Sequence, residues 1–456
     1  MKPNDAQHSK YVKMTTAPVG SLVTQLALPS IVSMLVSGIY NLADTFFVGQ
    51  INTQSVAALG IVFSYMTLVQ AIAFFFGQGS GNYISRALGR QETEQAGTMS
   101  AVGLVSSVAT GCVLAAFGFV MMRPVLSFLG STPTIMPYAS DYFTYILLGT
   151  PFIMGCFTMN NQMRQQGNAS LAMLGILSGA VLNIALDPLL IFGLGMGIRG
   201  AGLATALSQC AAFVLMLRLT GHRGGLPFKL SQFRPTLWRY REIAAGGLPS
   251  LARQGLMSIS TLCLNLMASY YGDEAIAAFS VVGRVAMLAG AAMIGYGQGF
   301  QPVCGFNFGA GNFDRVRAAF WHSLRVLTLY CLVLGIAGYV FASTIVSWFV
   351  TDDLRVINIG TEALRYQCLS FPLSGFIVMS NMFLQNIRRT IPAVIMASAR
   401  HGIFFLPAMF VGHWLLGLQG LEMAQAVADL ISFLLAIPLA LKALRDLDAT
   451  NHASQH

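Results

Sequence analysis

Hydrophobic positions along the chain form long blocks that only short polar segments interrupt. No charged residue occurs at positions 14–43, 45–85, 95–122 or 142–163. A stretch of ~20 apolar residues crosses the hydrocarbon layer as a helix, because a helix satisfies its own backbone hydrogen bonds where water is absent. The pattern therefore predicts an all-α polytopic membrane protein with twelve transmembrane helices, at roughly residues 22–48, 56–80, 97–122, 138–162, 168–193, 200–219, 246–270, 275–300, 318–349, 362–386, 392–415 and 420–441.

The composition supports a membrane protein, and the placement of charge orients it. Of the 456 residues 55% are hydrophobic and 9% are charged, whereas about 25% are charged in a soluble domain. The net charge of +9 comes from lysines and arginines in the N-terminus, in the even-numbered loops and in the C-terminal tail. By the positive-inside rule both termini are cytoplasmic, so the basic balance does not indicate a nucleic-acid partner. The polar first residues have no signal-peptide pattern and are expected to be retained.

The two halves of the chain repeat one another at a single offset of 220 residues. "LALPSIVSM" at position 26 matches "GGLPSLARQ" at 246, and "GIRGAGLATA" at 197 matches "GLQGLEMAQA" at 417. Each half holds six spans, an even number, so both halves enter the membrane in the same direction. This predicts two six-helix bundles related by a pseudo-two-fold axis along the membrane normal, with a substrate cavity between them. The expected organisation is a cytoplasmic segment 1–21, an N-lobe 22–221, a cytoplasmic linker 222–245, a C-lobe 246–441 and a cytoplasmic tail 442–456.

Acidic residues inside the N-lobe spans are the first functional candidates. A charged side chain at the bilayer centre costs ~2.5–3.5 kcal/mol on insertion scales. Asp44, Asp187 and Thr205 each lie five to seven residues from the outer end of their span, which places them at a common depth of ~8–10 Å. Tyr40 and Asp44, like Asn183 and Asp187, are four residues apart and share a helix face. These oxygen-rich faces predict a coupling site for a proton or for Na⁺. The alternative is that Asp187 caps or snorkels near the outer surface.

Pro188 directly follows the second acid, in "LNIALDPLLIFG". Proline lacks a backbone donor and crowds the carbonyl of Ile184, so a bend is expected here, with a free carbonyl beside the carboxylate.

The C-lobe lacks the equivalent acids, because the repeat offset places Leu264 where the N-lobe has Asp44. It has Asp429 instead, with Arg284 and Arg400 as candidate partners. A neutralised ion pair that fixes helix packing is the favoured interpretation, and a direct role in the substrate pathway is the alternative.

Three apolar residues, Met34, Met66 and Phe74, are candidates for lining a greasy cavity. His401, beside the basic residue of "SARHGIFF", is expected to pack or face a loop, and a proton relay is its alternative. "GQGSGNYISRALG" lacks the Gly-Lys-Ser/Thr of a phosphate loop, so nucleotide binding is not expected. The seven cysteines have no paired spacing and are expected to pack in the spans.

Three motifs together resemble the multidrug and toxic compound extrusion (MATE) family: "YNLADTFFVGQ", "LNIALDPLLIFGLGMGIRGAGLATALSQ" and "GQGFQPVCGFNFGAGNFDRVR". The last is most similar to the prokaryotic DinF- and MepA-like branch. The resemblance covers all twelve spans and implies the MATE, or MOP-type, fold. Its members are secondary antiporters, so no enzymatic activity and no cofactor beyond H⁺ or Na⁺ is expected. The N-lobe cation site of similar members matches Tyr40, Asp44, Asn183, Asp187 and Thr205 here, with a metal site for Na⁺ at the last four.

The resemblance further implies export of small organic cations or amphiphiles, lipid as the other partner, a monomeric state and a bacterial cytoplasmic membrane, with antibiotic resistance as an outcome. Some branches carry an essential acid on span 7 or 10, and neither span has a mid-membrane carboxylate here, so coupling is expected in the N-lobe alone. The alternatives are export of a natural metabolite and flipping of a lipid-linked precursor. An intramembrane enzyme or a structural scaffold is disfavoured, because the acids lack a catalytic glycine–aspartate signature and share one depth.

Overall fold

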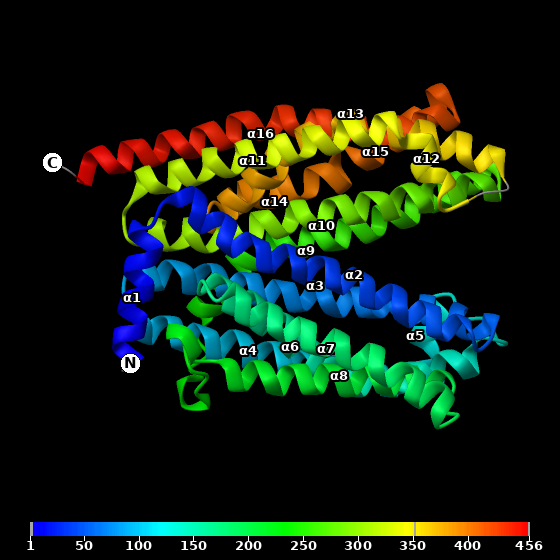
Figure 1. The fold of residues 1–456 in the computed structure, drawn as a ribbon, viewed down its shortest axis with the longest axis horizontal. Coiled ribbons are helices and arrows are strands. Elements are labelled where there is room, and N and C mark those ends of the chain that lie inside the picture. Colours follow the sequence, from blue (N-terminus) through cyan, green and yellow to red (C-terminus); the bar gives the residue numbers. More distant parts are fainter. Residues whose placement is uncertain (1–2, 351–352, 455–456) are drawn as a thin grey trace. The chain divides into compact units, whose positions relative to one another are not determined.

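A computed structural model describes residues 3–350 and 353–454, and helices make up most of both ranges (Figure 1). No strand occurs within these ranges, so the predicted all-α fold is confirmed. Among the described residues, eleven helices are long and apolar enough to cross a membrane. The remaining predicted span lies in α9 (Leu237–Ala268), which has sufficient length. Its membrane segment is more polar than the others because it contains Arg253, Gln254 and Asn265.

The chain folds into two compact units. The first contains the residues up to Thr16 together with Val32–Gly247, and the second contains Ala17–Ile31 together with the residues from Leu248 onward. The division at Gly247 lies next to the start of the predicted C-lobe at residue 246. The first half of the first transmembrane helix groups with the second unit, which the sequence pattern did not indicate.

Each unit is built almost entirely of helices, two of which, α2 (Val19–Gly49) and α9, contribute to both. The other helices of the first unit are α1 (Pro3–Thr16), α3 (Thr53–Gly89), α4 (Thr93–Val120), α5 (Met122–Phe128), α6 (Met136–Gln165), α7 (Ala169–Pro188), the π-helix η1 (Leu189–Gly193), α8 (Ile198–Leu219), and the short turns η2 (His222–Gly224) and η3 (Leu230–Gln232).

The second unit repeats this order of long helices. Its elements are η4 (Ser269–Tyr271), α10 (Asp273–Gly309), α11 (Phe313–Val340), α12 (Ala342–Ser347), α13 (Leu354–Asn386), α14 (Thr390–Ser398), the π-helix η5 (Ala399–Ile403), α15 (Phe405–Leu416) and α16 (Leu418–Ser454).

Local geometry bears out the internal repeat. Helices α3 and α10 both have 37 residues, and α4 and α11 both have 28. Gly197 precedes α8 with a φ of 57°, and Gly417, 220 positions later, precedes α16 with a φ of 62°. Both lie in the left-handed region that glycine adopts without steric cost. The Asn160 side chain donates to the Ala172 carbonyl at 3.0 Å, and Asn381 donates to the Ala393 carbonyl at 2.7 Å in the same way.

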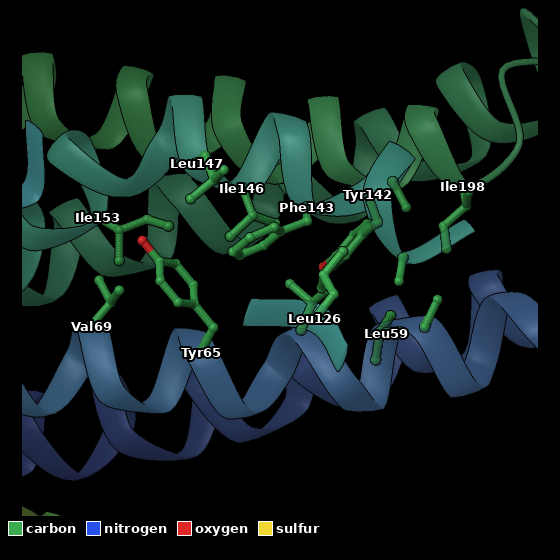
Figure 2. Close-up of a cluster of buried hydrophobic side chains, with 14 of the residues drawn as sticks. Leu59, Tyr65, Val69, Leu126, Tyr142, Phe143, Ile146, Leu147, Ile153 and Ile198 are labelled. Atoms are coloured by element: carbon green, nitrogen blue, oxygen red, sulfur yellow. The ribbon is translucent and has the colours of Figure 1, made fainter. Parts of the chain in front are cut away.

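A buried aromatic and aliphatic cluster holds α6 against α3 in the first unit (Figure 2). The edge of the Tyr65 ring meets Phe143, with centroids 4.9 Å apart and planes at 90°, an arrangement that contributes about 0.5–1.5 kcal/mol beyond area burial. Leu147 is fully buried in the same cluster. In a membrane such close packing, rather than exclusion from water, stabilises the helix contact. The cluster also fixes Tyr142, one residue before Phe143.

Helix α7 ends at Pro188, where the sequence predicts a bend. The chain continues as the π-helix η1, in which the Leu194 amide donates to the Leu189 carbonyl at 2.9 Å. Proline cannot donate and its ring crowds the preceding turn, so the hydrogen-bond pattern changes at this point. Gly200 then packs directly on the backbone of Leu190, which brings the first turns of α8 beside α7.

Candidate functional site

The first candidate acid, Asp44, lies in the second half of α2. Its side chain is 7% exposed. The Tyr142 hydroxyl, from α6, donates to Asp44 Oδ2 at 3.4 Å. This is a long hydrogen bond, and it attaches the carboxylate to the buried aromatic cluster of the first unit.

The second acid, Asp187, is fully buried at the end of α7. Asn183 lies one turn earlier on the same face, and its amide nitrogen donates to Asp187 Oδ1 at 3.4 Å. The same nitrogen lies 3.5 Å from the Thr205 hydroxyl on α8. Asn183 and Thr205 are both 2% exposed, so the four-residue spacing and the common depth seen in the sequence correspond to a buried polar contact.

The two carboxyl groups lie close enough to interact electrostatically with each other. Tyr40, one turn before Asp44 on α2, is half-buried and lies within electrostatic range of both. The structure therefore brings all five predicted coupling residues of the first unit into one cluster.

Three oxygens of this cluster are buried without a hydrogen-bond partner. They are Asp44 Oδ1, Asn183 Oδ1 and Asp187 Oδ2. A buried acceptor that makes no hydrogen bond costs about 1–3 kcal/mol, and more when it is charged. Carboxylate, amide and hydroxyl oxygens are the ligands that hard cations prefer, and a carboxylate can take a proton instead. The donor set therefore fits a proton or an alkali cation. Among the described residues no group of three or more His, Cys, Asp or Glu side chains could hold a metal ion.

Sequence reasoning missed Tyr142, which is 1% exposed and donates to Asp44. It lies six residues after Met136, the first residue of α6, and hence ~9 Å along the helix. The depth argument that selected Asp44, Asp187 and Thr205 selects Tyr142 as well when it is extended to tyrosine.

The acid of the second unit has a different environment. Asp429, on α16, is fully buried, and its two oxygens accept hydrogen bonds from four side chains: Arg400 (Nε 2.8 Å, Nη2 3.2 Å), Ser370 (3.0 Å), Ser374 (2.9 Å) and Gln425 (2.9 Å). Arg400 belongs to the π-helix η5 and also donates to Ser374 at 2.8 Å. A carboxylate with this many donors is a saturated, neutralised group.

Arg284, the other candidate partner of Asp429, is exposed on α10, and within the described chain no hydrogen bond or ion pair connects the two. Of the cavity-lining candidates, Met34 and Met66 are half-buried. Phe74 is 5% exposed, with its ring 5.7 Å from that of Phe157, so it packs inside the first unit. The backbone carbonyl of His401 accepts a hydrogen bond from the Ser260 hydroxyl of α9.

Among the described residues, eleven helices are long and apolar enough to cross a membrane, and one of the two units holds buried carboxylates with unpaired oxygens. These features are typical of a multi-pass transporter. The MatE family model matches residues 29–189 and 249–411. The chain belongs to this family, the MATE transporters, which confirms the family that the motifs resembled.

Characterised relatives are similar over nearly the whole chain. Multidrug export protein MepA of Staphylococcus haemolyticus (strain JCSC1435) is 28% identical over 417 residues, covering 90% of this chain and 91% of the relative. MepA of Staphylococcus aureus (strain MRSA252) is 27% identical over 436 residues, covering 94% and 95%.

Solved structures share the fold. A MATE transporter crystallised in complex with MaL6 superposes with a TM-score of 0.90 at 24% identity, covering 96% of this chain and 99% of the other. A MOP-superfamily transporter from Pyrococcus furiosus gives a TM-score of 0.88 at 25% identity, covering 96% and 98%.

Proposed function

We propose that this protein is a secondary active exporter of amphipathic organic compounds, driven by inward movement of H⁺ or Na⁺ that the acid cluster of the first unit binds. The observation that carries the proposal is that Asp44 and Asp187 are buried, interact with each other and retain unpaired oxygens. Two like charges in low dielectric are costly unless a cation or a proton compensates them. The names of the relatives, multidrug export proteins, support drug-like amphiphiles as the exported compounds.

In this mechanism the coupling ion is a substrate of the cluster. Asp44, Asn183, Asp187 and Thr205 would supply its oxygens, and Tyr142 would orient Asp44. Binding of the ion removes the electrostatic cost of one arrangement of the first unit more than that of another. A ligand shifts a conformational equilibrium only by such a difference in affinity. The π-helix that follows Asp187 is an irregular backbone segment at which α7 can bend.

The positions of Lys and Arg in the loops support an orientation with both termini in the cytoplasm of a bacterial cell. Export of a natural metabolite and flipping of a lipid-linked precursor would use the same fold. The relatives' names favour drug export over both.

The proposal is tested by dye accumulation in inverted membrane vesicles, driven in separate assays by a pH gradient and by a Na⁺ gradient. Asp44→Asn and Asp187→Asn are expected to lose gradient-driven accumulation while remaining inserted at wild-type level. The gradient that drives the wild-type protein identifies the coupling ion.

Asp141→Asn is the matched control, because Asp141 forms an ion pair with Arg199 at 3.0 Å on the surface of the same unit. This variant should transport at the wild-type rate. Wild-type accumulation in both Asp44→Asn and Asp187→Asn would refute the assignment of the coupling site.

A further inference from the structure

Arginines on the membrane helices of the second unit differ in whether another residue compensates their positive charge. Arg400 is neutralised by Asp429. Arg253 is half-buried on α9, on the helix face that also carries Ser260, which donates to η5. Arg284 is neither neutralised nor buried, and the mechanism above gives it no role.

Arg284 is the only charged residue between Ala275 and Phe313. It lies eleven residues after Asp273, the first residue of α10, and hence ~16 Å along the helix, about half the thickness of the hydrocarbon layer. Its side chain is exposed, and it makes no hydrogen bond or ion pair with any described residue. At the repeat offset the first unit has Ser64, which is also exposed, so this charge occurs in one unit only.

The exposed face of α10 around Arg284 combines this charge with two small residues and two bulky apolar ones. After Asp273, the exposed residues on this helix are Ser280, Gly283, Arg284, Met287 and Leu288. They follow one another at spacings of three and four residues and form one stripe. A guanidinium at mid-membrane depth is tolerated where it meets water or a partner. Because Arg284 has no partner among the described residues, its depth points to an aqueous surrounding that a polar substrate group could enter.

The same stripe also offers an apolar contact. Met287 is 55% exposed and Leu288 is 44% exposed, and both lie one turn after Arg284 on the same side of the helix. A guanidinium presents a planar fork of donors that matches a carboxylate in a bidentate arrangement. Methionine is polarizable and adapts to flat or irregular apolar groups.

We propose that Arg284 is a specificity-determining residue that binds the carboxylate of an amphiphilic substrate, whose apolar body lies along Met287 and Leu288. This inference rests on the proposed export function and names the class of substrate: carboxylate-bearing amphiphiles, either anionic or zwitterionic with a protonated amine. A purely cationic compound of the same shape is repelled at this position and binds less well.

The test compares a rhodamine dye that has a free carboxylate with the methyl ester of the same dye. Equilibrium binding of both is measured by fluorescence polarisation on the purified full-length protein in detergent, without an ion gradient. Loss of a charge-assisted bidentate pair is expected to weaken binding of the carboxylate dye to Arg284→Gln by about tenfold. Binding of the ester should change by less than about twofold or become tighter, and Arg284→Lys should retain part of the preference for the acid.

Arg325→Gln is the control for removal of one positive charge. Arg325 is exposed on α11, another membrane helix of this unit. Its neutralisation should leave the ratio of the two affinities unchanged. If Arg284→Gln alters both dyes equally, or alters neither, the proposal is wrong. A change of the same size in Arg325→Gln would also overturn it, since a general field effect would then explain the result.

This experiment separates the present inference from the coupling mechanism. The ratio of the two dye affinities is measured at equilibrium on each variant and does not require gradient-driven transport. A shifted acid-to-ester ratio in Arg284→Gln together with undiminished transport by the aspartate variants would refute the coupling site and leave the carboxylate site standing. An unshifted ratio in Arg284→Gln together with lost transport in both aspartate variants would refute the carboxylate site and leave the coupling site standing.

Discussion

The acids of both units are buried, but they differ in how many hydrogen bonds their oxygens accept. Asp429 is saturated by four donor side chains, one of them the cation Arg400. Asp187 receives one hydrogen bond of 3.4 Å, from Asn183, and its second oxygen has no partner. Asp44 is similar, with one 3.4 Å bond from Tyr142 and one unpaired oxygen.

The difference indicates which unit can exchange charge. A carboxylate that is already paired and hydrogen-bonded gains little from a proton or an alkali cation and loses much if its partner leaves. A buried carboxylate with a free oxygen gains from either ligand. We therefore infer that the energy of the first unit depends on the coupling ion, and that the Arg400–Asp429 pair fixes helix packing in the second unit.

The largest effect is expected on the stability of the second unit. Asp429→Ala leaves the Arg400 guanidinium buried without its counter-charge, and we expect the free energy of unfolding to fall by about 3–5 kcal/mol. The measurement is the midpoint of thermal unfolding of the purified protein in one detergent. Asp187→Asn removes a buried negative charge that no cation compensates. Its midpoint of thermal unfolding should therefore be equal to or above that of the wild-type protein.

A double variant tests whether the lost counter-charge causes this destabilisation. Asp429→Leu combined with Arg400→Met removes both charges and should be more stable than Asp429→Ala alone. Equal destabilisation by Asp429→Ala and Asp187→Asn would show that the two acids are not held differently.

A smaller effect is expected from the one hydroxyl that donates to Asp44. Tyr142→Phe removes a hydrogen bond worth about 1 kcal/mol, so the concentration of coupling ion that gives half-maximal transport should change by about fivefold. Tyr65→Phe is the matched control, because Tyr65 belongs to the same buried cluster and makes no hydrogen bond to either acid. An identical change in both variants would assign the effect to packing.

The smallest effect concerns a buried charge outside the membrane spans. Lys10 lies on α1, and its ammonium has no hydrogen-bond partner. Burial lowers the pKa of Lys10 from 10.5 to about 7. The packed helix thus holds the neutral amine between pH 7 and 10.5, whereas a detached helix holds the ammonium. Packing of α1 should therefore strengthen as the pH rises from 7 toward 10.5, and below pH 7 the cost of burying the charge is fully present.

A nitroxide at His8→Cys, an exposed position on α1, reports this packing in a background without the exposed Cys112. Its mobility should fall as the pH rises, and Lys10→Met should remove the dependence without altering transport. An unchanged pH dependence in Lys10→Met would mean that another group controls α1.

The acid cluster could be predicted from the sequence because depth in the membrane and spacing along a helix both follow from residue numbers. Asp44, Asn183, Asp187 and Thr205 have positions within their spans that can be counted, and a helix converts those counts into distances. Tyr142 was missed because an aromatic residue in an apolar span has the same pattern whether it packs or donates a hydrogen bond.

The features that escaped prediction depend on contacts between distant segments. From the sequence, Arg284 and Arg400 were both candidate partners of Asp429. The structure pairs Asp429 with Arg400 because of the π-helix η5, which no periodicity of apolar residues indicates. Likewise, Ala17–Ile31 groups with the second unit, since an apolar helix does not encode which neighbours it contacts.

The most direct test of the account is infrared difference spectroscopy of the carboxylic acid and carboxylate bands, recorded on a step in pH or in Na⁺ concentration. We expect the difference signal to be reduced in Asp44→Asn and in Asp187→Asn, and to be retained in a folded Asp429→Asn variant. A signal unchanged in both variants of the first unit, or lost in Asp429→Asn, would contradict it.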